Sequence, residues 1–282
     1  MSEQQTKPEV AAGPTEWATS SDGTRIAFER AGSGPVVVLV DGAMCYREFG
    51  PSRPMEAELG DRFTIIAYDR RGRGESGDTP PYSPEREYDD LRAVIEAVGG
   101  DVFVLGQSSG AGLAYEAAAA GAPMRAIAGY EAPYVGLRPG KDGAPLDFVG
   151  DLDAFIAAGE NGKAVDYFMV KMVRGPWFMP LMMRSMRKVW KQLLAVAPTL
   201  PYEARVMNSD FSVPVERFRG IRVPVLVVLG DKAEKSMVAA QTTLVETIPG
   251  ARHRLLKGQS HQVAPSALGP VVAEFFSAQA VV

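Results

Sequence analysis

Short apolar runs alternate with longer amphipathic stretches along most of this chain, and that alternation restricts the possible folds more than any other feature. Several runs consist of little but valine, isoleucine and leucine, such as Val36–Val40 and Val223–Leu229. Continuous apolar strands are typical of a parallel sheet that is covered on both faces, because neither face meets water. The sequence therefore predicts an α/β fold: a mostly parallel sheet flanked by helices.

The expected elements follow from these patterns. The expected strands are Arg25–Glu29, Val36–Val40, Phe63–Tyr68, Val102–Leu105, Ala126–Tyr130, Val223–Leu229 and Arg252–Leu256. The expected helices are Glu85–Val98, Gly110–Ala120, Lys235–Ile248 and Pro270–Gln279. About ninety residues between Tyr134 and Arg222 break the alternation, too many for a simple crossover. We expect a flexible tail at 1–13, a core formed by 14–134 and 223–282, and a helical cap at 135–222.

Composition excludes several classes of partner. The chain of 282 residues has a net charge of −4 with both signs mixed, which predicts neither nucleic-acid binding nor membrane binding. A single cysteine, Cys45, allows no internal disulfide. The first twenty residues lack the apolar stretch of a signal peptide. We expect a soluble, cytoplasmic protein with no bound metal and no cofactor, whose oligomeric state the sequence leaves open.

A glycine-flanked serine joins the strand Val102–Leu105 to the helix Gly110–Ala120. In such a G-x-S-x-G turn the serine, here Ser108, lies on a strained backbone with its hydroxyl clear of the sheet. The following amide, on Ser109, points to where an oxyanion would form, helped by the helix N-terminus. The bare pattern is common by chance, but its place between strand and helix favours a nucleophile over a helix cap.

A serine nucleophile needs a base, and the chain has two histidines. His253 lies within the expected strand Arg252–Leu256, where a structural role is more common. His261 follows that strand in a loop that should project over the strand ends, where Ser108 also emerges. The sequence therefore predicts His261 as the base.

Four segments together resemble the α/β-hydrolase superfamily, and more narrowly its small bacterial members with a helical cap. They are VVVLVDGAM, AYDRRGRGESG, GQSSGAG and GQSH, and the resemblance runs from about Glu16 to Phe276. It implies the α/β-hydrolase fold, with the cap inserted after strand six, Ala126–Tyr130. Asp41 replaces the histidine usual in the first segment, and by position the amide of Ala43 is the second oxyanion donor.

The same resemblance leaves the third member of the triad open. The family usually places its acid three residues beyond the glycine at Gly230, a position that holds alanine here. Asp231 and Glu234 lie near that position without matching it. Some relatives, including certain haloalkane dehalogenases, take the acid from the end of strand six, where this chain has Glu131. We favour Glu131 as the acid, with Asp231 as the alternative.

The AYDRRGRGESG segment does not have the spacing of a phosphate-binding loop, and in the family it is a structural loop in which Asp69 and Arg70 bond neighbouring turns. The cap is rich in methionine and tryptophan, which predicts an apolar substrate, although many of these side chains should only pack. The residues expected at the substrate are Met44, Gln107, Met169, Met172, Trp177, Met182, Met183 and Met186. Cys45 is a further candidate for the pocket wall.

These features predict a serine hydrolase that cleaves an ester, thioester or lactone of a hydrophobic small molecule through an acyl-enzyme. Gln107 and the displaced acid are also compatible with a tailoring enzyme that performs cyclisation, C–C cleavage or acyl transfer. A non-catalytic binding protein is a third reading, against which the presence of both Ser108 and His261 argues.

Overall fold

An eight-stranded sheet forms the centre of the molecule. The computed structural model describes residues 13–137, 139–140 and 143–280. The strands are β1 (Glu16–Thr19), β2 (Arg25–Gly32), β3 (Val36–Val40), β4 (Thr64–Tyr68), β5 (Val102–Gln107), β6 (Ala126–Tyr130), β7 (Val225–Gly230) and β8 (Arg252–Leu256), in the order β1-β2-β4-β3-β5-β6-β7-β8. β2 is antiparallel to both of its neighbours, and the strands from β4 to β8 are parallel.

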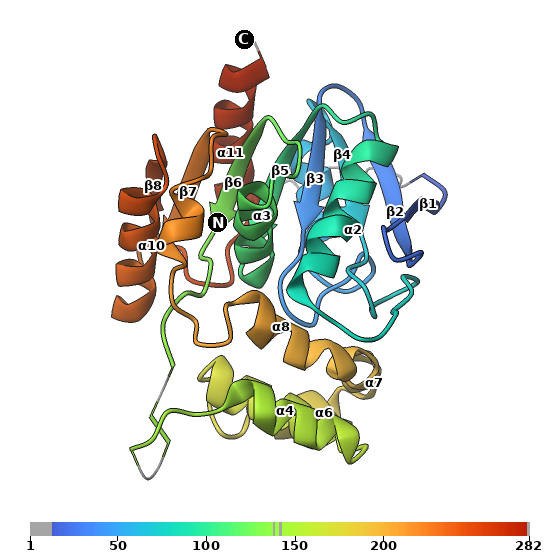
Figure 1. Ribbon diagram of the computed structural model, residues 1–282, viewed down its shortest axis with the longest axis vertical. Coiled ribbons are helices and arrows are strands. Elements are labelled where there is room, and N and C mark those ends of the chain that lie inside the picture. The colour runs from blue at the N-terminus through green and yellow to red at the C-terminus, as the bar shows by residue number, and fades with distance from the viewer. Residues whose placement is uncertain (1–12, 138, 141–142, 281–282) are drawn as a thin grey trace, which may run out of the picture.

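Helices cover both faces of this sheet (Figure 1). The helices outside the cap are α1 (Ser52–Leu59), α2 (Pro84–Ala97), α3 (Ser109–Ala119), α10 (Lys235–Thr247) and α11 (Pro265–Ala280). One apolar layer joins α2, α3 and α10 to the sheet through residues such as Leu91, Leu113 and Leu244. A second layer joins α1 and α11 to the opposite face through residues such as Met55 and Leu268. The central strands are therefore buried on both sides, as their continuous apolar sequences require.

A group of short helices lies between β6 and β7 in the chain. They are α4 (Phe148–Ala157), α5 (Asn161–Tyr167), a π-helical turn (Phe168–Met172), α6 (Met179–Ser185), α7 (Arg187–Val196), a 3₁₀ turn (Ala197–Thr199), α8 (Leu200–Val206) and α9 (Val215–Phe218). Most of them form a cap at the carboxyl end of the sheet, with α8 nearest to the strands (Figure 1). α9 belongs to the core instead, because it packs against α3 and α10.

The predicted fold class is confirmed, and the insertion follows β6 as expected. Two elements were missed. β1 is four residues long with one buried side chain, and α1 begins with Ser-Arg-Pro, so neither carries a strong periodic signal. α11 begins at Pro265, five residues before the predicted start at Pro270. The predicted tail lies, apart from Gly13, outside the described residues. None of the described helices is both long and apolar enough to cross a bilayer.

Candidate active site

Ser108 lies on a sharp turn between β5 and α3. Its backbone has φ 54° and ψ −128°, a conformation that non-glycine residues rarely adopt. The flanking glycines are needed for close approach: a Cβ on Gly106 would lie 2.5 Å from Ala111 Cα, and one on Gly110 would lie 2.0 Å from the Val40 carbonyl oxygen. The helix α3 can therefore approach β5 and β3 this closely only if both residues are glycine. This close packing holds the serine at the end of the sheet.

His261 lies beside this serine, although 153 residues separate them in the chain. Its Nε2 is 3.0 Å from Ser108 Oγ, and its Nδ1 is 2.8 Å from Glu131 Oε2. The loop that carries the imidazole is tied to the sheet, because Tyr130 Oη donates a hydrogen bond to the Ser260 carbonyl (2.5 Å). The structure thus brings a hydroxyl, an imidazole and a carboxylate into one hydrogen-bonded chain, the geometry that general-base activation of a serine requires.

The carboxylate of this chain is Glu131, which follows β6 directly. Its side chain is buried, its backbone has φ 46°, and its Oε1 accepts a hydrogen bond from the Gly230 N–H (3.0 Å). With one oxygen on a backbone donor and the other on His261, the carboxylate is held in a single orientation. A carboxylate placed in this way fixes the imidazole tautomer and stabilises the imidazolium.

The two other candidate acids have different partners. Asp231 is exposed, and its Oδ1 accepts a hydrogen bond from the Gly258 N–H (2.7 Å), so this carboxylate holds the loop after β8. Glu234 precedes α10 and forms an ion pair with Arg174 of the cap (3.0 Å). Within the described part of the chain, His261 pairs with the carboxylate of Glu131 alone.

The loop after β3 lies against the serine. A Cβ on Gly42 would be 2.9 Å from Ser108 Cβ, so no larger residue fits there. Ala43 and Ser109, the expected amide donors, both line the cavity that contains Ser108 and His261. Ser109 is the first residue of α3, where backbone N–H groups have no intrahelical acceptor. Both residues therefore border the space next to the Ser108 hydroxyl.

A largely apolar cavity opens between the sheet and the cap at this point. Its lining residues include Pro133, Val135, Phe148, Phe168, Met172, Val173, Glu203, Met207, Phe211, Glu234, Ser236 and Met237. The sequence did not single out most of them, because they come from five separate segments and share no motif. Within the described residues that line the cavity there is no lysine or arginine.

Of the residues predicted to contact the substrate, only Met172 lines the cavity. Trp177 is 80% exposed, and Met182 and Met186 also face solvent. Met44, Met169 and Met183 pack instead into the apolar interior of the cap, and Gln107 lies outside the lining. A methionine-rich composition showed that the cap is apolar but did not show which faces of its short helices turn inward.

Two residues considered earlier do not line the cavity. Cys45 is absent from its lining, contrary to expectation, and burial raises the pKa of its thiol to about 12, which makes it a poor nucleophile. His253 is exposed on the edge strand β8, in register with Val227. The described residues contain no group of three His, Cys, Asp or Glu side chains with the proximity of metal ligands.

Comparison with known proteins agrees with this architecture. Residues 32–266 match the model of a family described as the alpha/beta hydrolase family. The chain belongs to this family. An alpha/beta hydrolase from Sphaerobacter thermophilus is 46% identical, with a TM-score of 0.83 over 93% of this chain and 100% of that one.

More distant structures share the hydrolase fold. A thermophilic esterase from Thermogutta terrifontis is 20% identical, with a TM-score of 0.72 over 95% of this chain and 99% of that one. The enol-lactonase from Burkholderia xenovorans is also 20% identical, with a TM-score of 0.69 over 93% of this chain and 100% of that one. At this identity the similarity establishes the fold.

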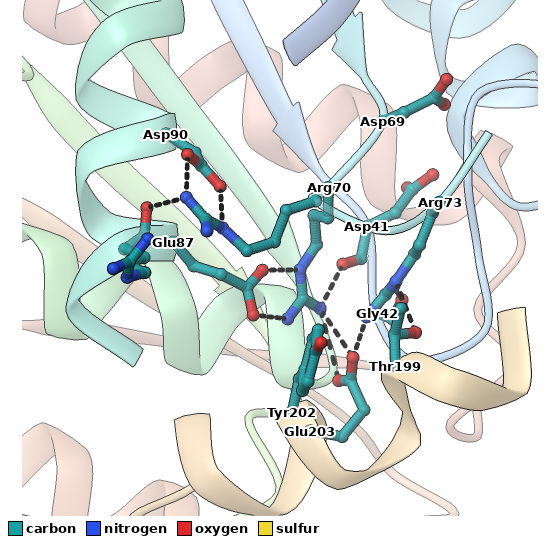
Figure 2. A network of polar contacts seen from close by, with 12 residues as sticks. Asp41, Gly42, Asp69, Arg70, Arg73, Glu87, Asp90, Thr199, Tyr202 and Glu203 are labelled. Carbon is teal, nitrogen blue, oxygen red and sulfur yellow. Dashed lines mark hydrogen bonds and ion pairs between the residues drawn. The ribbon is translucent and has the colours of Figure 1, made fainter. Parts of the chain in front are cut away.

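The DRRGRGESG segment of this hydrolase forms a buried ionic network (Figure 2). Arg70 pairs with Glu87 of α2 (2.6 Å) and with Glu203 of α8 (3.2 Å), and Arg73 also pairs with Glu203. These side chains are all at most 2% exposed. As the resemblance implied, Asp69 bonds a neighbouring turn, accepting from the Arg47 N–H (2.8 Å). The link from this loop to the cap was not expected from the sequence.

Proposed function

We propose that this protein is a serine hydrolase that cleaves an ester, thioester or lactone of a neutral, hydrophobic small molecule. The observation that carries the proposal is the uninterrupted hydrogen-bonded chain from Ser108 through His261 to Glu131. A binding protein needs a cavity, but it does not need a strained serine aligned with an imidazole and a buried carboxylate.

In the proposed reaction, Ser108 Oγ attacks the carbonyl carbon while His261 Nε2 takes the hydroxyl proton. The amides of Ala43 and Ser109 donate hydrogen bonds to the tetrahedral oxyanion. Collapse breaks the bond to the leaving alcohol or thiol, which receives the proton from His261 and leaves an acyl-enzyme. Water, deprotonated by His261, then attacks the acyl carbon, and the proton returns to Ser108 Oγ as the acid departs.

The preference for a neutral acyl group follows from the cavity wall. Its side chains are mostly apolar, and its charged members are carboxylates with partners: Glu131 with His261, Glu203 with buried arginines and Glu234 with Arg174. Because no lysine or arginine is present in the described lining, a substrate carboxylate would lose its hydration without gaining a cationic partner. Neutral esters should therefore be hydrolysed faster than esters that carry a carboxylate on the acyl side.

A fluorophosphonate probe tests the nucleophile directly. The folded protein should be labelled covalently at Ser108, located by peptide mass spectrometry, while heat-denatured protein and Ser108→Ala should not. p-Nitrophenyl butyrate should give a burst of p-nitrophenolate equivalent to the enzyme concentration. Absence of labelling in folded protein would remove the proposal. Labelling without any ester turnover would instead favour non-hydrolytic chemistry at the same serine.

A further inference from the structure

We propose that Arg73 is a positioning residue of the oxyanion hole, which aims the amide of Ala43 and is itself held by Glu203 of the cap. The proposal rests on the function proposed above, because it assigns a cause to one of the two amides of that site. It makes the cap part of the catalytic machinery as well as a cover for the cavity.

The contact between Arg73 and the oxyanion loop carries the first step. Arg73 Nη1 donates hydrogen bonds to the carbonyl oxygens of Gly42 (2.8 Å) and Cys45 (3.2 Å). In a planar trans peptide the N–H of one residue points away from the carbonyl of the preceding one. A bond that fixes the Gly42 carbonyl toward Arg73 therefore turns the Ala43 N–H away from Arg73. Ala43 lies on the wall of the cavity that contains Ser108.

The charge of the guanidinium adds a second effect. A hydrogen bond from a cation to the Gly42 carbonyl polarises the peptide group, which makes the Ala43 N–H a stronger donor. Cooperative strengthening of this kind is about 10–30% per bond. Arg73 is only 1% exposed, so water screens this interaction little.

The cap supplies the anchors of this guanidinium (Figure 2). Glu203 of α8 forms an ion pair with Arg73, and Thr199, just before α8, accepts a hydrogen bond from Arg73 Nε (3.2 Å). Both anchors lie more than 120 residues away in the chain. Arg73 is thus bonded both to the cap and to the loop after β3. A movement of either part would disturb the bonds of Arg73 to the other.

A separate apolar contact joins the same two parts. Met44, next to Ala43, is 6% exposed and packs into the interior of the cap with Leu152, Phe168 and Leu200. It has φ 63°, so the chain turns sharply there to place this side chain. The oxyanion loop is therefore fixed to the cap on both sides of Ala43: by the Gly42 carbonyl through Arg73, and by the Met44 side chain.

The central test compares Arg73→Lys with Arg71→Lys. Arg71 is a matched control because it belongs to the same loop, is also fully buried and also pairs with carboxylates, Asp90 and Asp22. Neither carboxylate belongs to the oxyanion loop. Lysine keeps the charge, but one ammonium cannot replace the planar fork that reaches two carbonyls and a carboxylate at once.

The expected result is a difference in kcat between two variants that are similarly destabilised. Arg73→Lys should lower kcat for p-nitrophenyl butyrate by about 10- to 100-fold, somewhat less than complete removal of an oxyanion donor. KM should change less than about threefold, because the oxyanion exists only in the transition state. Arg71→Lys should leave kcat within about threefold of the wild type.

A transition-state analogue separates positioning from a general loosening of the fold. An alkyl boronic acid becomes tetrahedral and anionic on Ser108, so its affinity should fall in Arg73→Lys by about the same factor as kcat. Affinity for butyrate, a planar product, should stay within about threefold. Thermal unfolding in the same buffer records how far each variant is destabilised.

Milder variants keep the test available if Arg73→Lys does not fold. Thr199→Val removes one acceptor of Arg73 and should lower kcat and boronate affinity together, by about two- to fivefold. Glu203→Gln should lower both further, because it removes the charge that faces Arg73.

Equal losses of kcat in the Arg71 and Arg73 variants, or losses confined to KM, would overturn the positioning role. Failure of the wild type to react with fluorophosphonate would instead overturn the proposed function itself.

Discussion

Two carboxylates follow neighbouring parallel strands of this hydrolase, and the structure uses them differently. Glu131 comes directly after β6 and Asp231 directly after β7. Glu131 is 1% exposed and contacts His261, whereas Asp231 is exposed and accepts a hydrogen bond from the Gly258 N–H. Both positions lie at the carboxyl end of the sheet, where α/β proteins place their sites.

The difference shows that the position of a carboxylate at the end of a strand is not enough to bring it to His261. Glu131 turns inward through a backbone with φ 46°, and the Gly230 N–H at the end of the next strand holds one of its oxygens. The strand β7 therefore still contributes to the proposed triad, but with a backbone donor in place of a carboxylate. Asp231 instead accepts a hydrogen bond from the loop that carries His261, so it affects the imidazole only through the position of that loop.

Glu131→Gln should have the largest effect on this comparison. The glutamine oxygen can still accept from the Gly230 N–H, but its amide nitrogen would then face His261 Nδ1 and favour the tautomer that cannot act as base. We expect kcat to fall by about 10³- to 10⁴-fold with little change in the unfolding temperature. Steady-state kinetics with p-nitrophenyl butyrate and thermal unfolding measure the two quantities.

Asp231→Asn serves as the control for that experiment, because it changes a carboxylate one strand away. Its kcat should remain within about threefold of the wild type. If Asp231→Asn instead lost activity as severely as Glu131→Gln, the two strand ends would share the role of the acid. Activity retained in Glu131→Gln would show that the contact with His261 does not contribute to catalysis.

The parts of this molecule that follow from local sequence were predictable. Continuous apolar runs predicted the buried strands. The glycine-flanked motif predicted Ser108, and the position after the last strand predicted His261. The preference for Glu131 over Asp231 depended on a resemblance, because no local pattern records that a side chain turns inward. The cavity wall and the bond between Arg73 and Glu203 could not be predicted, since they join segments far apart in the chain whose packing decides which faces meet.

A third carboxylate, Asp41, follows another parallel strand, and its ionised form destabilises the folded protein. Asp41 follows β3, is 3% exposed and accepts a hydrogen bond from Ser52 Oγ (2.8 Å). Burial raises the pKa of this carboxyl from 3.8 to about 6, despite the Ser52 hydrogen bond and the nearby Arg73 and Arg70. The folded protein therefore binds a proton here more tightly than the unfolded chain, so this carboxyl favours folding below about pH 4 and loses that contribution as the pH rises through 6.

Asp41→Asn should remove this dependence. Above pH 7 the ionised carboxylate costs the folded state up to about 3 kcal/mol, at 1.4 kcal/mol per pKa unit. Because the new amide nitrogen needs a partner, we expect a net gain of about 1–2 kcal/mol at pH 8 and none at pH 4. Urea unfolding at both pH values measures the difference. A gain that is the same at both would show that Asp41 does not titrate between them.

The smallest effect is expected for the stability of Asp231→Asn. The amide oxygen of asparagine can still accept from the Gly258 N–H, but it is a weaker acceptor than a carboxylate, and the site is exposed. We expect the free energy of unfolding to fall by no more than about 1 kcal/mol in urea titrations. Asp231→Ala, which removes the acceptor, should destabilise the fold more and should also raise the rate of hydrogen exchange at the Gly258 amide.

Equal losses of stability in the two variants would mean that the charge, and not the hydrogen bond, holds the loop that carries His261. Repeating both measurements in 1 M salt then distinguishes the two causes, because screening weakens a charge effect at an exposed site far more than a hydrogen bond.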